Sequence, residues 1–233
     1  MLRTSASTRA AELRTLSARL CECRRCPRLA AYVGSFSADP AYWARPVPGF
    51  GDSAAKLLVL GLAPGAHGAN RTGRPFTGDG AGVLLYQTLH DFGLATKAVP
   101  VSRDDGLRLR GVWITNAVRC APPENKTTPD EERECSSWLH AEIALLPSIR
   151  AVVALGRTAH DAALRLARAK GKVRSADFAF AHGATHAVPG IPPLFDCFHT
   201  SRYNTNTGRV NLAMVHAVFR HAAAAAGLAI PSP

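Results

Sequence analysis

Residues 56–80 read KLLVLGLAPGAHGANRTGRPFTGDG, a short apolar run that passes directly into a glycine-rich loop. The apolar run, residues 56–62, is typical of a strand buried on both faces inside a parallel sheet. The loop, residues 61–80, holds six glycines, two prolines and two arginines, a composition typical of a backbone that turns tightly and approaches a ligand. It contains neither a Walker A motif nor a G-x-G-x-x-G fingerprint, which argues against mononucleotide phosphate binding. We therefore expect a pocket of another kind after this strand; a long flexible surface loop is the alternative.

The same order of strand and helix recurs along the chain. Three more apolar runs indicate buried strands, at residues 111–116, 150–155 and 194–198. Helical periodicity follows the four runs in turn, at residues 82–92, 129–146, 158–169 and 212–226. Thr128 and Glu131 are spaced as a capping box for the second of these helices, and a further helix is expected over about residues 1–22. The alternation predicts a single α/β domain over residues 1–233, with a central parallel sheet and helices on both of its faces.

The chain is basic: 28 lysines and arginines face 17 acidic residues, which gives a formal net charge of +11. Such an excess favours a polyanion, above all nucleic acid, as the partner. Arginine supplies 23 of the 28 basic residues, which is also typical of a GC-rich genome, so codon bias is the alternative explanation. No apolar run approaches the roughly 18 residues of a membrane span, and we expect no membrane association.

Polar and aromatic side chains follow the predicted strands, where ligands bind in sheets of this kind. The loop after the first strand offers an aromatic ring (Phe76), a carboxylate (Asp79) and two cations (Arg71 and Arg74). Asn116 ends the second strand, and an asparagine there can both donate to and accept from the edge of a nucleobase. Its alternative role is to tie loop backbone together.

The segment after the fourth strand, residues 197–209, reads CFHTSRYNTNTGR and is polar with few charges. His199 lies at the strand tip, and hydroxyl and amide side chains suited to phosphate contacts follow it. A histidine at such a position is otherwise a structural residue with satisfied hydrogen bonds. Cys197 falls inside the predicted strand, and we expect it in the core.

The six cysteines are distributed unevenly, at positions 21, 23, 26, 120, 135 and 197. Cys23 and Cys26 form a C-x₂-C turn that lets two thiolates face one metal centre, and the remote pair Cys120 and Cys135 can complete a site with four thiolates. The long second spacing fits an iron–sulfur cluster somewhat better than zinc, and spacing alone leaves both open. Cys21 is an alternative first ligand.

Four motifs carry a resemblance to a known family. They are GLAPGAHGANRTGRPFTGD, NAVRCAPPENKTTPDE, ALGRTAH and HTSRYNTNTGR, in that order and with the C-x₂-C turn upstream. From Cys23 to the final predicted helix, the chain resembles the family 5 (type b) uracil-DNA glycosylases. The resemblance implies that superfamily's fold, a three-layer α/β/α sandwich on a central four-stranded parallel sheet. It also implies a [4Fe–4S] cluster on Cys23, Cys26, Cys120 and Cys135.

The resemblance further implies a monofunctional DNA repair enzyme. It would flip uracil, and other deaminated or damaged bases such as hypoxanthine or ethenocytosine, out of double-stranded DNA and hydrolyse the N-glycosidic bond, leaving an abasic site. We expect a monomer that works in the cytoplasm on the bacterial nucleoid. The alternative class is a non-catalytic iron–sulfur protein that binds nucleic acid. Hydrolysis of free nucleosides is a third option, disfavoured by the net charge.

Roles for the base pocket come from the same resemblance. Phe76 would stack on the flipped base, with Gly61 and Ala63 beside it. Asn116 would read the base edge through paired hydrogen bonds. His199 would stabilise the oxyanion that develops on the leaving base.

The water-activating group and the DNA contacts complete the expected site. Related families carry a carboxylate or asparagine where this chain has Ala63, so Asp79 is the residue expected to orient or activate water. Catalysis that relies mainly on leaving-group stabilisation is the alternative. The basic insert at residues 97–110 is expected to be a solvated surface loop, with DNA backbone contact as a secondary possibility. The residues expected to hold the DNA are Arg71, Arg74, Ser201, Arg202, Asn204 and Asn206.

Overall fold

A computed structural model of the chain describes residues 6–231 and contains one six-stranded sheet in the order β1-β3-β2-β4-β6-β5. The strands are β1 (Phe50–Gly51), β2 (Leu57–Gly61), β3 (Val112–Asn116), β4 (Ala151–Leu155), β5 (Thr185–His186) and β6 (Leu194–Cys197). The four central strands β3, β2, β4 and β6 run parallel, and they are the four that the apolar runs predict. The expected four-stranded sheet therefore gains an antiparallel strand at each edge. β1 and β5 have two residues each, which is too short to leave a periodic signal in the sequence.

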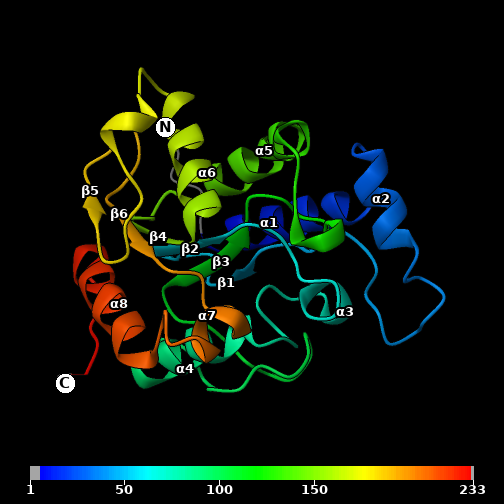
Figure 1. The fold of residues 1–233 in the computed structure, drawn as a ribbon, viewed down its shortest axis with the longest axis horizontal. Helices are drawn as coiled ribbons and strands as arrows, with labels where there is room; N and C mark the ends of the chain where they lie inside the picture. Colours follow the sequence, from blue (N-terminus) through cyan, green and yellow to red (C-terminus); the bar gives the residue numbers. More distant parts are fainter. Residues whose placement is uncertain (1–5, 232–233) are drawn as a thin grey trace.

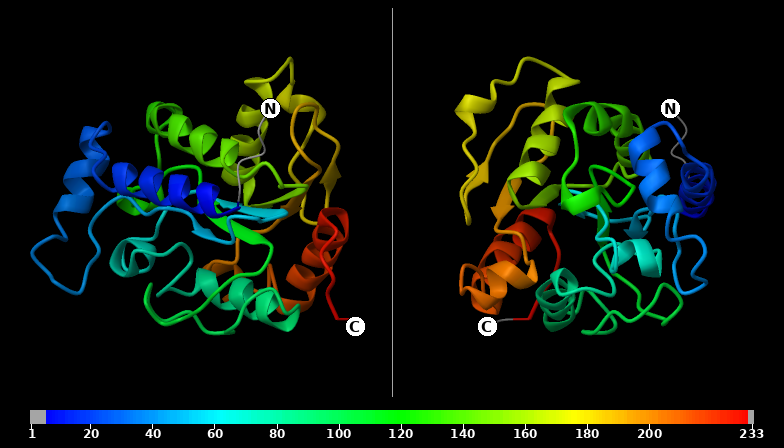
Figure 2. Two further views of the ribbon diagram at one scale, coloured as in Figure 1. Left: turned by 180° about the vertical axis from the view of Figure 1, so that it is seen from behind. Right: turned by 45° about the vertical axis from the view of Figure 1, so that its right-hand side comes forward.

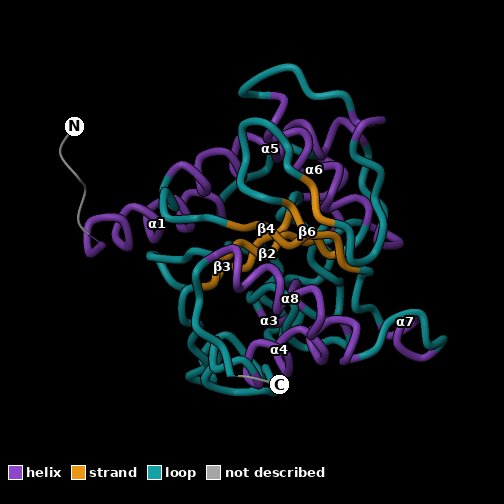
Figure 3. The backbone as a smooth tube through the Cα atoms, turned by 90° about the vertical axis from the view of Figure 1, so that its left-hand side faces the viewer, coloured by secondary structure: helices purple, strands orange, loops and turns teal. Residues whose placement is uncertain are grey.

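Helices cover both faces of this sheet and complete the three layers (Figure 1). α1, α5 and α6 lie on one face, and α4 and α8 lie on the other (Figure 3). The helices are α1 (Ala6–Cys21), α2 (Pro27–Gly34), α3 (Ala69–Thr72), α4 (Ala81–Asp91), α5 (Pro129–Ala144), α6 (Arg157–Arg168), α7 (Arg202–Asn206) and α8 (Leu212–Ala226), with 3₁₀ turns η1 (Pro123–Asn125) and η2 (Ser175–Asp177).

The predicted helices agree with the structure to within two residues at each end, for α4, α5, α6 and α8. The expected amino-terminal helix is α1, and the first five residues of that prediction lie outside the described residues. The sequence did not predict α2, α3 and α7. These helices have eight, four and five residues, so they carry little periodicity.

The apolar runs are continuous because both faces of each central strand are covered. All five residues of β2 are buried. Leu57 and Val59 belong to the core between the sheet and helices α4 and α8, whereas Leu58 and Leu60 belong to the core beneath α5 and α6. The sheet is therefore held from both sides, and its strand ends are fixed points from which loops can position side chains.

The expected capping box starts α5. The Thr128 hydroxyl accepts a hydrogen bond from the Glu131 N–H at 3.3 Å, and the Glu131 carboxylate accepts one from the Thr128 N–H at 2.9 Å. The cap fixes the residue at which the loop after β3 ends and α5 begins. From there α5 crosses the sheet face toward α1.

All four parallel strands end at the same edge of the sheet, so the segments that follow them meet there. The segment between α2 and β1 loops out beside α3 at this edge (Figure 2). Its Trp43 N–H donates to the Arg71 carbonyl at 2.8 Å, and its Ala44 N–H donates to the Asn70 carbonyl at 3.1 Å. Among residues 6–231 no helix is long and apolar enough to cross a membrane.

Candidate functional site

A cavity of about 680 Å³ opens where the four parallel strands end. Every one of the four segments after those strands contributes to its wall. Of the residues expected to bind or act on a base, the cavity brings together Ala63, Phe76, Asp79, Asn116 and His199, and the DNA-contact candidates Ser201 and Arg202 line it as well. A polar constellation inside a largely preformed concave site is typical of a small-molecule or nucleobase pocket.

Phe76 forms an aromatic wall of this cavity and is only 7% exposed. Its backbone has φ 53°, a left-handed conformation that is uncommon for a bulky side chain. Gly61 lies directly behind the ring, because a Cβ added there would fall 2.7 Å from Phe76 Cζ and nearer still to Asn116 Oδ1. Gly61 itself is not among the residues that line the cavity, and its lack of a side chain leaves room for the Phe76 ring and the Asn116 amide.

Asn116 ends β3 directly opposite Gly61 in the sheet register. The residue is 3% exposed, and its Oδ1 is buried with no hydrogen-bond partner among the described residues. A buried acceptor left unpaired is costly, and such atoms mark places where a ligand supplies the missing donor. The alternative that Asn116 ties loop backbone together is therefore not supported at this atom.

His199 follows β6 and faces the same cavity, with its ring centroid 6.3 Å from that of Phe76. Burial lowers the pKa of His199, and the nearby Asp79 carboxylate offsets part of that effect. The ring is therefore neutral at neutral pH and has one N–H to donate. Asn204 fixes the backbone here by donating from Nδ2 to the His199 carbonyl at 2.7 Å, and the neighbouring Thr200 hydroxyl donates to the Ala81 carbonyl at 2.6 Å.

Asp79 also lines the cavity, two residues before α4 begins. One carboxylate oxygen accepts the Ala81 N–H at 3.0 Å. Two loop glycines wrap the other oxygen: a Cβ on Gly65 would lie 2.7 Å from Oδ2, and one on Gly68 would lie 2.5 Å from the carboxyl carbon. The glycines of the loop therefore make space for this carboxylate.

Arg74 does not reach the cavity, so the expected DNA contact is wrong for this residue. Its side chain is 2% exposed and forms a bidentate ion pair with Asp105, with nitrogen to oxygen distances of 2.9 and 2.6 Å. Burial of a guanidinium requires such a partner, and here the partner comes from the insert at residues 97–110. The insert is accordingly more than a solvated loop.

Of the other expected DNA contacts, Ser201 and Arg202 line the cavity, whereas Arg71, Asn204 and Asn206 lie outside its lining. Ser201 caps α7, because its hydroxyl accepts the Asn204 N–H at 3.3 Å. Asn204 is half-buried and bonds His199, as described. The remaining candidates, Arg71, Arg202 and Asn206, are exposed.

The cavity lining also includes polar residues that the sequence did not single out for the site, among them His67, Asn125 and Arg157. Arg157 follows β4 almost directly, so the rule that ligands bind beyond strand ends would have found it. His67 shares a 2.6 Å hydrogen bond with the Tyr42 hydroxyl. Asn125 has a left-handed backbone, with φ 56°, and although it falls within the motif NAVRCAPPENKTTPDE, the sequence analysis assigned it no role.

A second, smaller cavity of about 20 Å³ is lined by all four cysteines expected as metal ligands. Cys23 and Cys26 come from the turn between α1 and α2, Cys120 from the segment after β3, and Cys135 from α5. All are free thiols. Cys21, the alternative ligand, lies outside this cavity, and its thiol donates instead to the Pro46 carbonyl at 3.7 Å.

Apolar side chains line the cavity around the cysteines together with the charged residues Arg24, Arg25, Arg119 and Glu134. Burial raises the pKa of the Cys120 thiol to about 12 and that of Cys135 to about 11, and the neighbouring cysteines add to the rise at Cys120. The Arg119 N–H donates to Cys135 Sγ at 3.3 Å. A cation or cluster would remove the cost of burying these thiolates next to one another.

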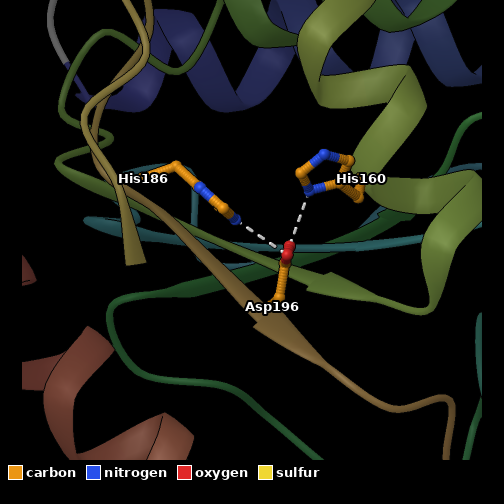
Figure 4. Close-up of side chains that lie close together, drawn as sticks. All are labelled: His160, His186 and Asp196. Atoms are coloured by element: carbon orange, nitrogen blue, oxygen red, sulfur yellow. Dashed lines mark hydrogen bonds and ion pairs between the residues drawn. The ribbon is translucent and has the colours of Figure 1, made fainter. Parts of the chain in front are cut away.

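A third polar group lies under α6 (Figure 4), and none of its three residues lines the large cavity. Asp196 on β6 accepts from His160 Nδ1 at 2.7 Å and from His186 Nε2 at 2.9 Å. His160 Nε2 also lies 2.8 Å from the Phe178 carbonyl, so both ring nitrogens face acceptors, an arrangement that favours the protonated ring and raises the pKa of His160. Among the described residues this is the one group of three side chains whose possible ligand atoms all lie within 4.8 Å of one another. Its donors and acceptors satisfy each other, which makes it a buried ion pair that anchors the segment before β6.

Comparison with known proteins agrees with this architecture. Residues 48–223 match the model of the Uracil DNA glycosylase superfamily. A type-5 uracil-DNA glycosylase of Thermus thermophilus is 50% identical over 94% of this chain and 99% of its own length. Proteins of the same name from Mycobacterium bovis and Pyrobaculum aerophilum are 46% and 45% identical, over 91% and 90% of this chain and 81% and 91% of their own lengths. Matches of this identity and extent show that the chain belongs to the type-5 uracil-DNA glycosylases of the uracil-DNA glycosylase superfamily.

Proposed function

We propose that this protein removes uracil from DNA by hydrolysing its N-glycosidic bond, leaving an abasic site. The observation that carries the proposal is the buried, unpartnered Oδ1 of Asn116 inside a cavity that also holds the Phe76 ring and His199. The names of the relatives, which are type-5 uracil-DNA glycosylases, support the same activity.

Recognition of the base follows from the chemistry of these groups. A base cannot be reached inside a duplex, so the nucleotide turns out of the stack at a cost of a few kcal/mol, least for a mispaired base. The flipped ring stacks on Phe76, an interaction typically worth about 1–3 kcal/mol per base. Uracil offers a ring N–H to the waiting Oδ1 of Asn116, whereas cytosine has no hydrogen on that nitrogen. The amide therefore favours uracil over the normal base from which it arises.

Bond cleavage places charge on two fragments. As the bond between the base nitrogen and the sugar C1′ breaks, its electron pair stays with uracil, and the sugar becomes oxocarbenium-like. The neutral His199 ring donates an N–H to the oxygen on which the negative charge collects. Water adds to C1′ and loses a proton; the Asp79 carboxylate orients this water and accepts the proton.

Exposed cationic and polar side chains at or near the cavity would contact the DNA backbone. Arg157 and Arg202 are exposed cations in the cavity lining, and Ser201 adds a neutral donor there; Arg71 and Asn206 are exposed but lie outside the lining. Exposed cations of this kind bind phosphates and make affinity depend on salt. Lys126 is the sole lysine of the matching motifs and is outside the cavity lining, which supports hydrolysis by a monofunctional enzyme without a Schiff base.

We further propose that Cys23, Cys26, Cys120 and Cys135 hold a [4Fe–4S] cluster. Thiolates around one tetrahedral zinc ion lie about 3.8 Å apart, given a zinc–sulfur distance near 2.3 Å. Within residues 6–231, no three of these sulfurs lie within 4.8 Å of one another, a spacing that suits a larger group. When bound, the cluster joins the α1–α2 turn to the segment after β3 and to α5, and its role in the reaction is structural.

The same pocket accommodates other lesions. Its volume of about 680 Å³ exceeds what one pyrimidine fills, and Ala63 leaves the wall beside Gly61 open. We therefore propose that hypoxanthine and ethenocytosine are also removed.

A glycosylase assay tests the activity. An oligonucleotide duplex with one uracil opposite guanine should become alkali-labile without added nucleotide, and Asn116→Ala, Phe76→Ala and His199→Ala should each slow the reaction, His199→Ala by about 10²–10³-fold. His221→Ala, an exposed histidine on α8 outside the cavity, is the matched control. Salt-dependent binding with no base released from uracil, hypoxanthine or ethenocytosine duplexes would contradict the proposal and favour a non-catalytic binding protein.

A further inference from the structure

The conformation of Phe76 needs support from its surroundings. Its φ of 53° lies in a region that a bulky side chain rarely adopts, and such residues persist where neighbouring contacts hold them. Gly82 allows the backbone this close approach, because a Cβ there would lie 2.9 Å from the Phe76 carbonyl carbon. The direction of the ring that faces the base is therefore set by contacts made by its neighbours in the chain.

Those contacts are hydrogen bonds made by Pro75 and Thr77, the residues on either side of Phe76. On one side, the Pro75 carbonyl accepts the Tyr86 hydroxyl at 2.9 Å. On the other, the Thr77 hydroxyl donates to the same carbonyl at 3.2 Å and accepts Arg74 Nε at 3.0 Å. Arg74 and Thr77 thus tie the residues before and after Phe76 to each other.

The carboxylate of Asp105 holds Arg74, and with it these hydrogen bonds, in place. Asp105 accepts hydrogen bonds from both terminal nitrogens of Arg74, at 2.9 and 2.6 Å. It also accepts the backbone N–H groups of Val101, Ser102 and Leu107, at 2.8, 3.2 and 2.8 Å. Burial acts to raise the pKa of Asp105, but Arg74 and these amides outweigh it and hold that pKa well below its usual range. The carboxylate is a fixed anion in an ordered turn, and 31 residues separate it from Arg74 in the chain.

We propose that Asp105 is a positioning residue for the base-stacking ring: through Arg74 and Thr77 it fixes the backbone at Phe76, so that the ring faces the flipped base. The inference rests on the proposed function for its kinetic consequence. It gives the insert at residues 97–110 a task in recognition, although the insert contributes no side chain to the cavity.

A double-mutant cycle tests the coupling. Asp105→Asn keeps the size of the side chain and removes the charge, and it should lower kcat/KM on a uracil duplex by about 10- to 100-fold, because small misplacements at a site cost this much. In a Phe76→Ala background the same change should cost less than about threefold, since the ring it positions is absent. Asp104→Asn is the matched control, because that neighbouring carboxylate is 90% exposed and pairs only with Arg103 at 3.9 Å.

Thr77→Val tests the same chain of contacts at a second residue. It retains shape and loses the hydroxyl that links Arg74 to the Pro75 carbonyl, and it should show the same dependence on Phe76. All rates are compared at a temperature where each variant is folded by circular dichroism. If Asp105→Asn lowers kcat/KM by the same factor with and without the Phe76 ring, the inference is overturned and Asp105 has a purely structural role.

A spectroscopic measurement separates this inference from the proposed activity. With 4-fluorophenylalanine at position 76, the ¹⁹F resonance should be single and sharp in the parent protein, and Asp105→Asn should shift or broaden it while Asp104→Asn leaves it unchanged. An unchanged resonance in Asp105→Asn refutes the positioning role even in an active enzyme. The expected shift in a protein that releases no uracil would uphold it while refuting the proposed function.

Discussion

At the residue scale, the pocket depends on positions where a side chain is absent. Gly61 separates Phe76 from Asn116, and Gly65 and Gly68 surround the Asp79 carboxylate. At Gly61 the backbone conformation is ordinary, so the requirement is space and not flexibility.

Gly61→Ala should therefore damage the site more than the fold. The new methyl group meets Phe76 Cζ at 2.7 Å and must push the ring or the Asn116 amide aside. We expect kcat/KM on uracil DNA to fall by at least about tenfold, since overpacking in a filled site forces side chains from their preferred rotamers. Gly171→Ala is the control, because a Cβ there has nothing within 4 Å. Equal kinetics for the two variants would contradict the geometry of the pocket.

Arg74 marks the limit of what the residues alone predict. The motif suggests a cation at the pocket, and the neighbouring Phe76 and Asp79 do line it. The partner that draws Arg74 into the interior is Asp105, 31 residues away in an insert without any motif. Long-range ion pairs of this kind leave no local pattern, so the sequence could place the loop but not the direction of each side chain.

At the element scale, the four parallel strands and their helices were predictable because each carries a full periodic signal. The two edge strands and the short helices α2, α3 and α7 were not, since they are too brief for periodicity and are held by tertiary contacts. Both Thr128 and Glu131 were predictable because a capping box is a local pattern with a fixed spacing.

Thr128→Ala tests the contribution of that cap. Loss of the hydroxyl leaves the Glu131 N–H without its acceptor, which typically costs about 1 kcal/mol. The melting temperature should fall by about 2–4 °C for a domain of this size. Thr15→Ala, which removes an exposed hydroxyl from within α1, serves as the comparison in the same thermal scans. A fall no larger than that of the comparison would show that the cap contributes little.

The ion pair under α6 makes stability depend on pH. Burial acts to lower the pKa of His160, but the hydrogen bond and charge of Asp196 outweigh it, so the pKa is raised above its unfolded value. The folded state therefore binds the proton more tightly, and the added stability is present below about pH 6.5 and lost as pH rises through the raised pKa.

Chemical denaturation between pH 5 and 9 measures this effect. The parent protein should lose part of its free energy of unfolding as the pH rises, and His160→Asn should show a smaller dependence. His221→Gln, at an exposed position, should retain the slope of the parent. Parallel curves for the parent and His160→Asn would show that His160 is neutral in the folded state.

At the scale of the whole molecule, three distant segments meet at the cysteines, with α1 and α2 on one side and α5 on the other. A cluster there would close the loop between Cys26 and Cys120, which are 94 positions apart in the sequence, and constraints on long loops stabilise the folded state most. Cys135→Ser removes a ligand of the proposed cluster, so we expect it to abolish the iron content and visible absorbance that the cluster would give, and to lower the melting temperature. Cys21→Ser is the matched control, since Cys21 is buried but lies outside this cavity. The same iron content in both variants would refute the assigned ligands.

Finally, the pocket draws its walls from four stretches of chain that run from Leu62 to Arg202. A cut in the exposed turn at residues 168–172 would divide it between two polypeptides, neither of which carries every wall. Each fragment alone should be inert, and mixing them should restore uracil release only when the halves of the sheet reassociate. Excision by the two pieces together would then serve as a complementation signal for assembly of the intact fold.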